Sequence, residues 1–290
     1  MIKDSGKPIV IAGPCSLESE EQLYKIVTSF NNSRVNIIRA GIWKPRTTPN
    51  SFEGIGEEGL KWIKNLKKEF DFKIAVEVGT PRHVELALKY EIDVLWIGAR
   101  TTVSPFSIND IADSVKGVNI PILIKNPINP DMALWIGAVE RFRNAGIRDI
   151  MAIHRGFSVN YKNKYRNLPL WSIPLRFKAQ FPEIPMICDP SHISGDRKLI
   201  YEIAKKSIDL NYDGLMIEVH PNPQEALSDA NQQLTPDDFL ELIASLDIDK
   251  ERRENTENMS RIEQIRNEIY ELDNEIAVAM EERRLLENLI

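Results

Sequence analysis

Residues 35–48 read Val-Asn-Ile-Ile-Arg-Ala-Gly-Ile-Trp-Lys-Pro-Arg-Thr-Thr, an apolar run followed directly by three cations and two hydroxyls. The apolar part, residues 35–39, has the length and character of a buried strand. Ligands of parallel α/β proteins bind in the loops that follow the strands, and Arg, Lys and Thr side chains suit phosphate or carboxylate oxygens. The stretch therefore predicts a strand of a parallel sheet that ends in an anion-binding loop.

Short apolar runs recur along the chain, and segments with helical signals separate them. The runs are Ile9–Gly13, Val35–Arg39, Lys73–Val78, Val94–Ala99, Pro121–Lys125, Asp149–His154, Pro185–Cys188 and Gly214–Val219. The helical segments include Glu18–Phe30, Glu57–Phe70, Pro81–Tyr90, Asp131–Ala145 and Lys198–Asn211. Eight strand–helix units in about 250 residues predict an α/β fold, the (β/α)8 TIM barrel. The alternative is an open doubly wound sheet, but no G-x-G-x-x-G follows the first run.

The composition limits the classes of partner. A formal net charge of −6 and a pI near 5.5 argue against a nucleic-acid surface, so we expect no nucleic-acid partner. No run approaches the roughly 18 apolar residues of a membrane span, and residues 1–8 lack the apolar core of a signal peptide. We therefore expect no membrane partner and a cytoplasmic location. In that compartment Cys15 and Cys188 should be free thiols or metal ligands.

The composition changes sharply after Leu246. We predict a barrel over residues 1–248, a charged linker over 249–258 and one amphipathic helix over 259–290. The helix begins with a capping box, Ser260-Arg-Ile-Glu263, and its apolar residues fall on a heptad seam. Such a helix is not stable alone in water, so we expect it to dock on a partner.

Cations follow several of the predicted strands. They are Arg39, Lys44, Arg46, Arg100, Lys125 and Arg155. In a barrel these positions share one rim, and unpaired buried charges are costly. Because few carboxylates are visible at the same strand ends, the pattern favours two anionic, phosphorylated substrates over a structural ion-pair network.

A different set of side chains at that rim suits a metal ion. Cys15, His192, Glu218 and Asp229 each follow or end a predicted strand. Thiolate, imidazole and carboxylate together favour Mn²⁺, Fe²⁺, Co²⁺ or Zn²⁺ over Mg²⁺ and Ca²⁺. Of the remaining Cys and His residues, Cys188 is predicted in the core and His83 on a helix surface. His154 and His220 are predicted to face the rim, where they could hydrogen-bond a ligand.

Motifs at these positions carry a family resemblance. They are Ala-Gly-Pro-Cys15, Lys44-Pro-Arg-Thr-Thr48, Gly98-Ala-Arg100, Asp189-Pro-Ser-His192, Glu218-Val-His220 and Leu227-Ser-Asp229. In this order, over about residues 8–246, the chain resembles the class I beta 3-deoxy-D-arabino-heptulosonate 7-phosphate (DAHP) synthases. That resemblance implies condensation of phosphoenolpyruvate with erythrose 4-phosphate, the first step of the shikimate pathway to the aromatic amino acids. The chain departs from many relatives in having Lys125-Asn-Pro where they carry Lys-Arg-Gly.

The resemblance also implies roles for individual residues. The metal, with Mn²⁺ as the first expectation, would be bound by Cys15, His192, Glu218 and Asp229. Phosphoenolpyruvate would be held by Arg39, Lys44, Arg100, Lys125, Arg155 and the backbone of Ala99. Erythrose 4-phosphate would be received by Lys44, Pro45, Arg46 and Thr47. The catalytic residues would be Lys44, His192 and Cys15. Lys44 is our hypothesis for the proton donor, with His192 or a water molecule as alternatives.

The C-terminal helix resembles the first helix of the all-helical chorismate mutases. Arg266, Leu272-Asp273 and Glu282-Arg283-Arg284 match that family. Arg266 and Arg283 lie roughly 25 Å apart along a helix, so they would serve different sites of an antiparallel dimer. Because the sequence ends at Ile290, we expect a shortened bifunctional protein without mutase activity. Its helix would form a homodimer and convey feedback by prephenate or chorismate.

Two other functions remain as alternatives. The first is a 3-deoxy-octulosonate 8-phosphate synthase, a family that resembles this chain around the metal. It carries Lys-Ala-Asn-Arg-Ser where this chain has Lys44-Pro-Arg-Thr, which disfavours that reading. The second is an inactive barrel that acts as a regulatory scaffold for a mutase, which the complete cation and metal sets disfavour.

Overall fold

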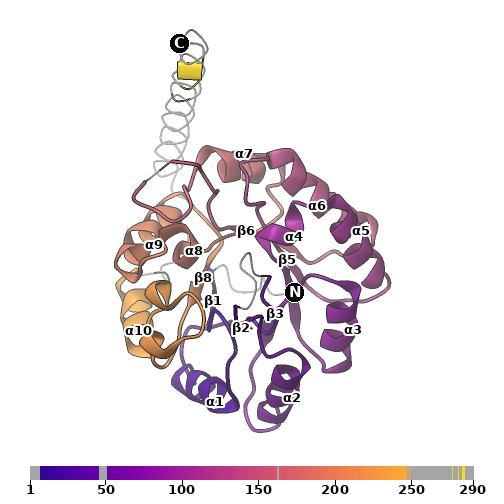
Figure 1. The fold of residues 1–290 in the computed structure, drawn as a ribbon, viewed down its shortest axis with the longest axis vertical. Helices are drawn as coiled ribbons and strands as arrows, with labels where there is room; N and C mark the ends of the chain where they lie inside the picture. Colours follow the sequence, from indigo (N-terminus) through magenta and orange to yellow (C-terminus); the bar gives the residue numbers. More distant parts are fainter. Residues whose placement is uncertain are drawn as a thin grey trace.

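Strands and helices alternate along the chain, as the apolar pattern predicted (Figure 1). The computed structural model describes residues 7–45, 51–161, 163–246, 248, 276, 280 and 283–284. Within these residues the strands are β1 (Ile9–Gly13), β2 (Ile37–Ala40), β3 (Ile74–Val78), β4 (Val94–Ile97), β5 (Ile122–Lys125), β6 (Ile150–His154), β7 (Met186–Cys188) and β8 (Gly214–Glu218). Each predicted apolar run overlaps one of them, and only β2 extends past the end of its run, by one residue.

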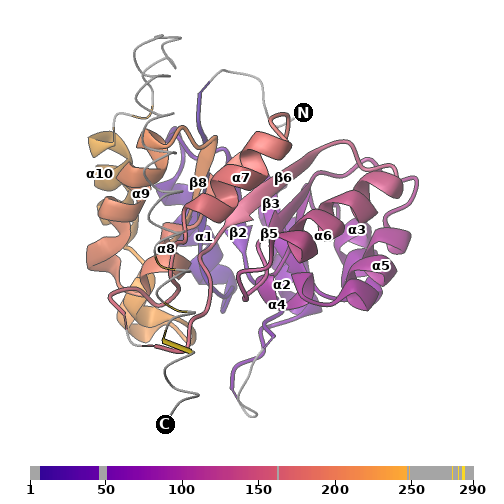
Figure 2. The ribbon, with the colours of Figure 1, turned by 90° about the horizontal axis from the view of Figure 1, so that it is seen from above.

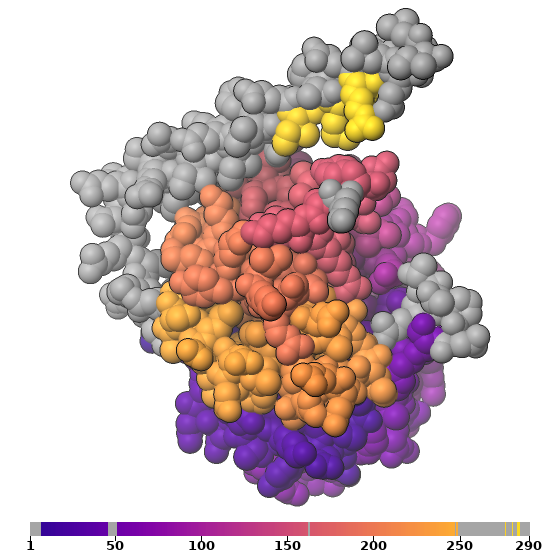
Figure 3. Space-filling model, turned by 60° about the vertical axis from the view of Figure 1, so that its left-hand side comes forward, coloured from indigo at the N-terminus to yellow at the C-terminus, as the bar shows by residue number. Residues whose placement is uncertain are grey.

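The strands form a closed parallel barrel in chain order, which confirms the predicted TIM-barrel fold. Closure pairs the first strand with the last, from Ile9 opposite Gly214 to Gly13 opposite Glu218. The first and last units are therefore neighbours, and in Figure 3 the orange surface of the later units lies directly against the indigo surface of the N-terminal ones. This pairing brings residues far apart in the sequence to one end of the barrel.

Helices surround the barrel, and most of them follow a residue whose side chain caps the helix N-terminus. They are α1 (Glu20–Ser29), α2 (Glu57–Leu66), α3 (Pro81–Lys89), α4 (Ala99–Thr102), α5 (Pro105–Ser114), α6 (Met132–Asn144), α7 (Ser172–Gln180), α8 (Pro190–Ser194), α9 (Ile200–Asp209) and α10 (Pro236–Ser245). Ser19, Thr80 and Asp131 cap α1, α3 and α6 with their side-chain oxygens. Figure 2 shows α9 and α10 on one side of the strands and α3 and α5 on the other.

The second strand begins two residues later than predicted. Asn36 precedes it, and its side-chain Oδ1 accepts a hydrogen bond from the backbone of Val10 at 2.8 Å. The backbone N–H of Asn36 donates to the carbonyl of Val10, also at 2.8 Å. The side chain of Asn36 thus accepts the backbone N–H of β1 that would otherwise bond to a backbone carbonyl. Regular strand pairing therefore begins only at Ile37.

Side-chain alternation divides the apolar residues between two cores. One fills the barrel and the other lies between the barrel and its helices. Met216 of β8 points into the barrel, whereas Leu215 and Ile217 pack against the helices. The next inward position on β8 is Glu218, so the residue at the carboxyl end of the strand places a charge at the top of the apolar filling.

Several predictions fall at the edges of the described residues. The linker 249–258 and Arg266 lie outside them, as do Arg46 and Thr47. Of the helix predicted over 259–290, Ile276, Met280, Arg283 and Arg284 are described, and each is helical and exposed. The domain boundary, the homodimer and the mutase-like role of Arg283 stay predictions. Among the described helices, none is long and apolar enough to cross a lipid bilayer.

Candidate active site

A layer of charged side chains closes the carboxyl end of the barrel interior. Each follows an inward-facing apolar residue by two positions, as alternation requires. The buried members are Arg39, Lys125, Arg155, Asp189 and Glu218. On these five strands the inward-facing residues therefore change from apolar to charged within one step.

The structure pairs some of these charges, which corrects one expectation. The cations were predicted to have few carboxylate partners, yet Arg39 Nη2 lies 3.0 Å from Glu218 Oε1 and Lys125 Nζ lies 2.8 Å from Asp189 Oδ2. Asp189 had not been predicted to have a role of its own. Burial alone would raise the pKa of Asp189, but His192, Lys125 and Arg39, which face it, hold that pKa well below its ordinary value. The rim is thus an ion-pair layer as well as a cation-rich one.

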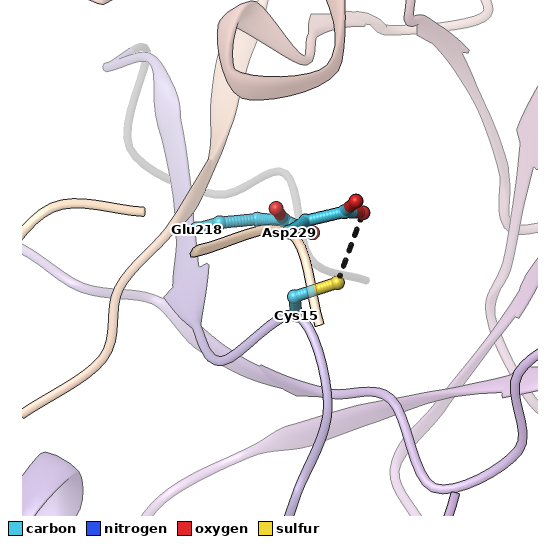
Figure 4. Close-up of side chains that lie close together, drawn as sticks. All are labelled: Cys15, Glu218 and Asp229. Carbon is cyan, nitrogen blue, oxygen red and sulfur yellow. Dashed lines mark hydrogen bonds between the residues drawn. The ribbon is translucent and has the colours of Figure 1, made fainter. Parts of the chain in front are cut away.

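Three of the four predicted metal ligands converge. One donor atom from each of Cys15, Glu218 and Asp229 can be chosen so that all lie within 4.8 Å of one another. The Cys15 thiol donates to Asp229 Oδ2 at 3.4 Å, as Figure 4 shows. His192 Nε2 lies 3.6 Å from Glu218 Oε1 and so stands beside this group. The geometry therefore brings three of the predicted ligands together and places the fourth, His192, next to them.

Protonation in this cluster follows from burial and from the nearby charges. Burial, with help from the charge of Glu218, raises the pKa of the Cys15 thiol to about 12. Burial also lowers the pKa of His192, so its imidazole is neutral at pH 7. The pKa of Asp229 is lowered despite its burial, because His192, Arg166 and Lys44 face it. Without a metal, the site holds a thiol, a neutral imidazole and two carboxylates.

Lys44 reaches back from the loop after β2 to the thiol. Its Nζ donates to the carbonyl of Cys15 at 2.9 Å and lies 3.2 Å from Cys15 Sγ. A Cβ on Gly41 would fall 2.1 Å from that carbonyl oxygen and 3.2 Å from Lys44 Nζ, so only glycine leaves room for this arrangement. Burial would lower the pKa of Lys44, but Cys15, Glu77 and Glu218 raise it, and the side chain is an ammonium at neutral pH.

The remaining cations differ in exposure. Arg155 is buried, and burial together with the charges of Arg166 and Arg100 lowers its pKa to about 10 despite the opposing effect of Asp189. Arg100 is exposed on α4, next to Ala99 at the start of that helix. Pro45 is exposed as well. The structure thus places Arg39, Lys125 and Arg155 in the buried charged layer, while Lys44 reaches the site from the loop after β2 and Arg100 is exposed.

One histidine prediction was wrong, and another left out a contact. His154 does not face the rim: its Nε2 pairs with the carbonyl of Pro169 at 2.6 Å and its Nδ1 with Tyr212 Oη at 3.1 Å, behind the barrel wall. Burial lowers its pKa to about 3. His83 is not a simple surface residue, since its ring stacks on Trp43 at 4.1 Å with 2° between the planes. Cys188 is buried in the outer core, as predicted.

Residues that the sequence had not singled out hold the cations in place. Asn126 accepts from the backbone N–H of Arg155 at 2.7 Å and donates to the carbonyl of Gly156 at 2.8 Å. Asn167 accepts from Arg155 Nη1 at 2.7 Å and donates to the carbonyl of His192, also at 2.7 Å. Asn126 occupies the position where the chain departs from Lys-Arg-Gly, and it has a definite structural function there.

Comparisons with known proteins agree with this geometry. A family model, the DAHP synthetase I family, matches residues 1–255. The phospho-2-dehydro-3-deoxyheptonate aldolase of Thermotoga maritima is 30% identical over 237 residues, which cover 82% of this chain and 68% of the relative. A 2-dehydro-3-deoxyphosphooctonate aldolase of Helicobacter pylori strain P12 is 28% identical over 274 residues, 83% of this chain and 94% of that protein.

Solved structures are similar over the same region. The crystal structure of the T. maritima DAHP synthase has a TM-score of 0.74 and 29% identity, covering 83% of this chain and 68% of that one. A truncated form of the 3-deoxy-D-arabino-heptulosonate 7-phosphate synthase from T. maritima has a TM-score of 0.70 and 25% identity, covering 83% and 86%.

A barrel whose strand ends carry buried cations beside a thiol–carboxylate cluster is an enzyme that handles small anionic substrates. The matched family is narrower than that class. The chain belongs to the DAHP synthetase I family, and it is an enzyme of the 3-deoxy-7-phosphoheptulonate synthase type, a transferase of aromatic biosynthesis. The family-level resemblance seen in the sequence is confirmed.

Proposed function

We propose that the chain condenses phosphoenolpyruvate with erythrose 4-phosphate to give DAHP and phosphate, and that it requires a divalent transition metal. The observation that carries this proposal is that the predicted substrate-binding cations lie next to the predicted metal ligands. Arg39 Nη2 lies 3.0 Å from Glu218 Oε1, and Lys44 Nζ lies 3.2 Å from Cys15 Sγ. Cations suited to substrate oxygens thus touch the donors suited to a metal.

The donor set fits a transition metal better than a structural role. Glu218 Oε1 and His192 Nδ1 are buried and make no hydrogen bond of good geometry, although Oε1 lies 3.0 Å from Arg39 Nη2 and Nδ1 lies 2.8 Å from Asp189 Oδ2. A thiol, an imidazole and two carboxylates match Mn²⁺, Fe²⁺, Co²⁺ or Zn²⁺, of which Mn²⁺ is our first choice. When bound, the metal would supply a Lewis acid to polarise the aldehyde of the sugar phosphate.

The protein's own side chains would bind and orient the two substrates and would protonate the aldehyde oxygen. Arg39, Lys125 and Arg155 would hold the carboxylate and phosphate of phosphoenolpyruvate, with Arg100 at the outer edge. A bond forms between its C3 and the aldehyde carbon, water adds at C2, and the C2–O bond to phosphate breaks. The water oxygen becomes the keto oxygen at C2, and its two protons go to the leaving phosphate and back to Lys44. The Lys44 ammonium would donate a proton to the former aldehyde oxygen as it becomes an alkoxide.

The octonate-forming reaction is the second candidate, because curated relatives with that name are 28% identical over most of this chain. The sequence Lys44-Pro-Arg-Thr favours the four-carbon acceptor, since it differs from the Lys-Ala-Asn-Arg-Ser of that family. The two reactions share phosphoenolpyruvate and differ in the aldose phosphate, so the acceptor alone discriminates them.

Purified enzyme should consume phosphoenolpyruvate with erythrose 4-phosphate at a kcat/KM at least about a hundredfold above that with arabinose 5-phosphate, a gap of roughly 2.7 kcal/mol in transition-state binding. Parallel assays of phosphate release with each acceptor, in the presence of Mn²⁺, measure this ratio. A preference for the pentose phosphate would establish the octonate-forming alternative, and no turnover with either would support the inactive scaffold.

Metal binding should strengthen as the pH rises. A thiol whose pKa is about 12 is protonated at neutral pH and must lose its proton to bind a metal. Each unit of pH makes the thiolate ten times more available, so the apparent Mn²⁺ affinity should rise about tenfold per unit between about pH 6.5 and 8.5. The thiol dominates this dependence, because burial lowers the pKa of His192 below its ordinary value.

Calorimetric titration of the metal-free enzyme in two buffers of different ionisation enthalpy measures the number of protons released per Mn²⁺. We expect about one proton. Affinity that does not change with pH, with no proton released, would contradict thiolate ligation by Cys15.

A further inference from the structure

The two carboxylates of the cluster are held by side chains that are not themselves predicted ligands. Arg166 Nη1 donates to Asp229 Oδ1 at 2.9 Å and to Gln232 Oε1 at 2.7 Å. Gln232 in turn donates through Nε2 to Glu218 Oε2 at 2.7 Å. A single chain of hydrogen bonds therefore runs from Arg166 through Gln232 to Glu218, with a branch to Asp229.

This chain occupies one oxygen of each carboxylate and leaves the other oxygen for the centre of the site. Asp229 Oδ1 takes the arginine, while Oδ2 lies 3.4 Å from the Cys15 thiol. Glu218 Oε2 accepts from the glutamine, while Oε1 lies 3.0 Å from Arg39 Nη2 and 3.6 Å from His192 Nε2. Both tethered oxygens thus fix the rotation of their carboxylates, and both remaining oxygens point toward the thiol and the imidazole.

The backbone conformation near Arg166 and at Asp229 accommodates these hydrogen bonds. Gly195 has a left-handed φ of +68°, and a Cβ there would lie 2.5 Å from the Cβ of Arg166. Asp229 itself is left-handed, with φ of 47°, a conformation that costs energy in a residue other than glycine. Gln232 ends the short 3-10 turn η3 (Ala230–Gln232) that follows, and it is 1% exposed. Glycine at position 195 thus leaves space for Arg166, and the backbone is strained at Asp229, whose carboxylate Arg166 binds.

We propose that Arg166 and Gln232 are positioning residues that orient Asp229 and Glu218 for metal binding. The inference rests on the proposed metal-dependent function and adds two residues that are not among the predicted metal ligands or substrate-binding residues. Ligands held in the correct orientation bind a metal without first losing rotational freedom, and loss of such outer hydrogen bonds weakens metal affinity about 10- to 100-fold.

The test is Mn²⁺ binding by the full chain in the absence of substrate, with free Mn²⁺ quantified by electron paramagnetic resonance. Arg166→Met and Gln232→Met should each raise the Kd for Mn²⁺ about 10- to 100-fold. The matched control is Arg197→Met, because Arg197 donates to the backbone carbonyls of Ala230 and Asn231 in the same segment but to neither carboxylate. Its Kd should stay close to that of the unchanged enzyme.

Equal Kd values for Arg166→Met, Gln232→Met and Arg197→Met would overturn the inference. Thermal unfolding of each metal-free variant checks that it is folded. Arg166 is 44% exposed, so that replacement keeps the test decisive even if the buried Gln232 does not tolerate change. Failure of the proposed function has a different signature: the unchanged enzyme would bind no Mn²⁺, or Cys15→Ala would bind it equally well.

Discussion

Replacement of Cys15 by alanine should lower kcat at least about a thousandfold, even with Mn²⁺ in large excess. A metal that polarises a carbonyl contributes several kcal/mol to transition-state stabilisation, and about 4 kcal/mol corresponds to a factor of a thousand in rate. Cys15 is fully buried and its thiol lies 3.4 Å from Asp229 Oδ2. Alanine at this position removes the one soft donor from the cluster while changing little of the packing around it.

The chain offers a matched control in its other cysteine. Cys188 of β7 is equally buried, but it packs in the core between the barrel and its helices. Cys188→Ala should lower the thermal unfolding temperature and leave kcat and the Kd for Mn²⁺ unchanged. Steady-state kinetics with Mn²⁺ and binding measurements on both variants make the comparison. If Cys15→Ala retained the turnover of Cys188→Ala, the thiol would have no part in the reaction.

Much of the site could be predicted because it depends on local sequence rules. Apolar runs marked the strands, and charges directly after them marked the rim. The same alternation could have supplied two further residues, since Asp189 and Glu77 each follow an inward-facing residue, Ile187 and Ala75, by two positions. It would also have turned His154 outward, because Ile153 before it points into the barrel.

Other parts of the site depend on contacts that no local pattern encodes. Arg166 and Asp229 are 63 positions apart and meet through two irregular loops. The stack of Trp43 on His83 joins the loop after β2 to the start of α3, so it depends on the packing of two neighbouring strand–helix units. Loops lack the periodicity that identifies strands and helices, so the direction of their side chains is fixed only by tertiary packing.

Lys44→Met should lower kcat by about 10²- to 10⁴-fold, the range expected for loss of a general acid. Methionine matches the length of the side chain but removes the ammonium that lies 3.2 Å from Cys15 Sγ. The raised pKa of Lys44 keeps the group charged at neutral pH. A developing alkoxide is a far stronger base than an amine, so proton transfer to it from the Lys44 ammonium is favourable despite that raised pKa.

Lys44→Arg separates proton donation from charge. The guanidinium keeps the positive charge but has a pKa above about 12 and different geometry, so it is a poorer donor. We expect Lys44→Arg to recover the KM for phosphoenolpyruvate toward that of the unchanged enzyme while its kcat stays low. Initial rates with each substrate varied at saturating Mn²⁺ give both constants. A normal kcat in Lys44→Met, with only the KM values raised, would show that Lys44 binds substrate and that the proton comes from another group.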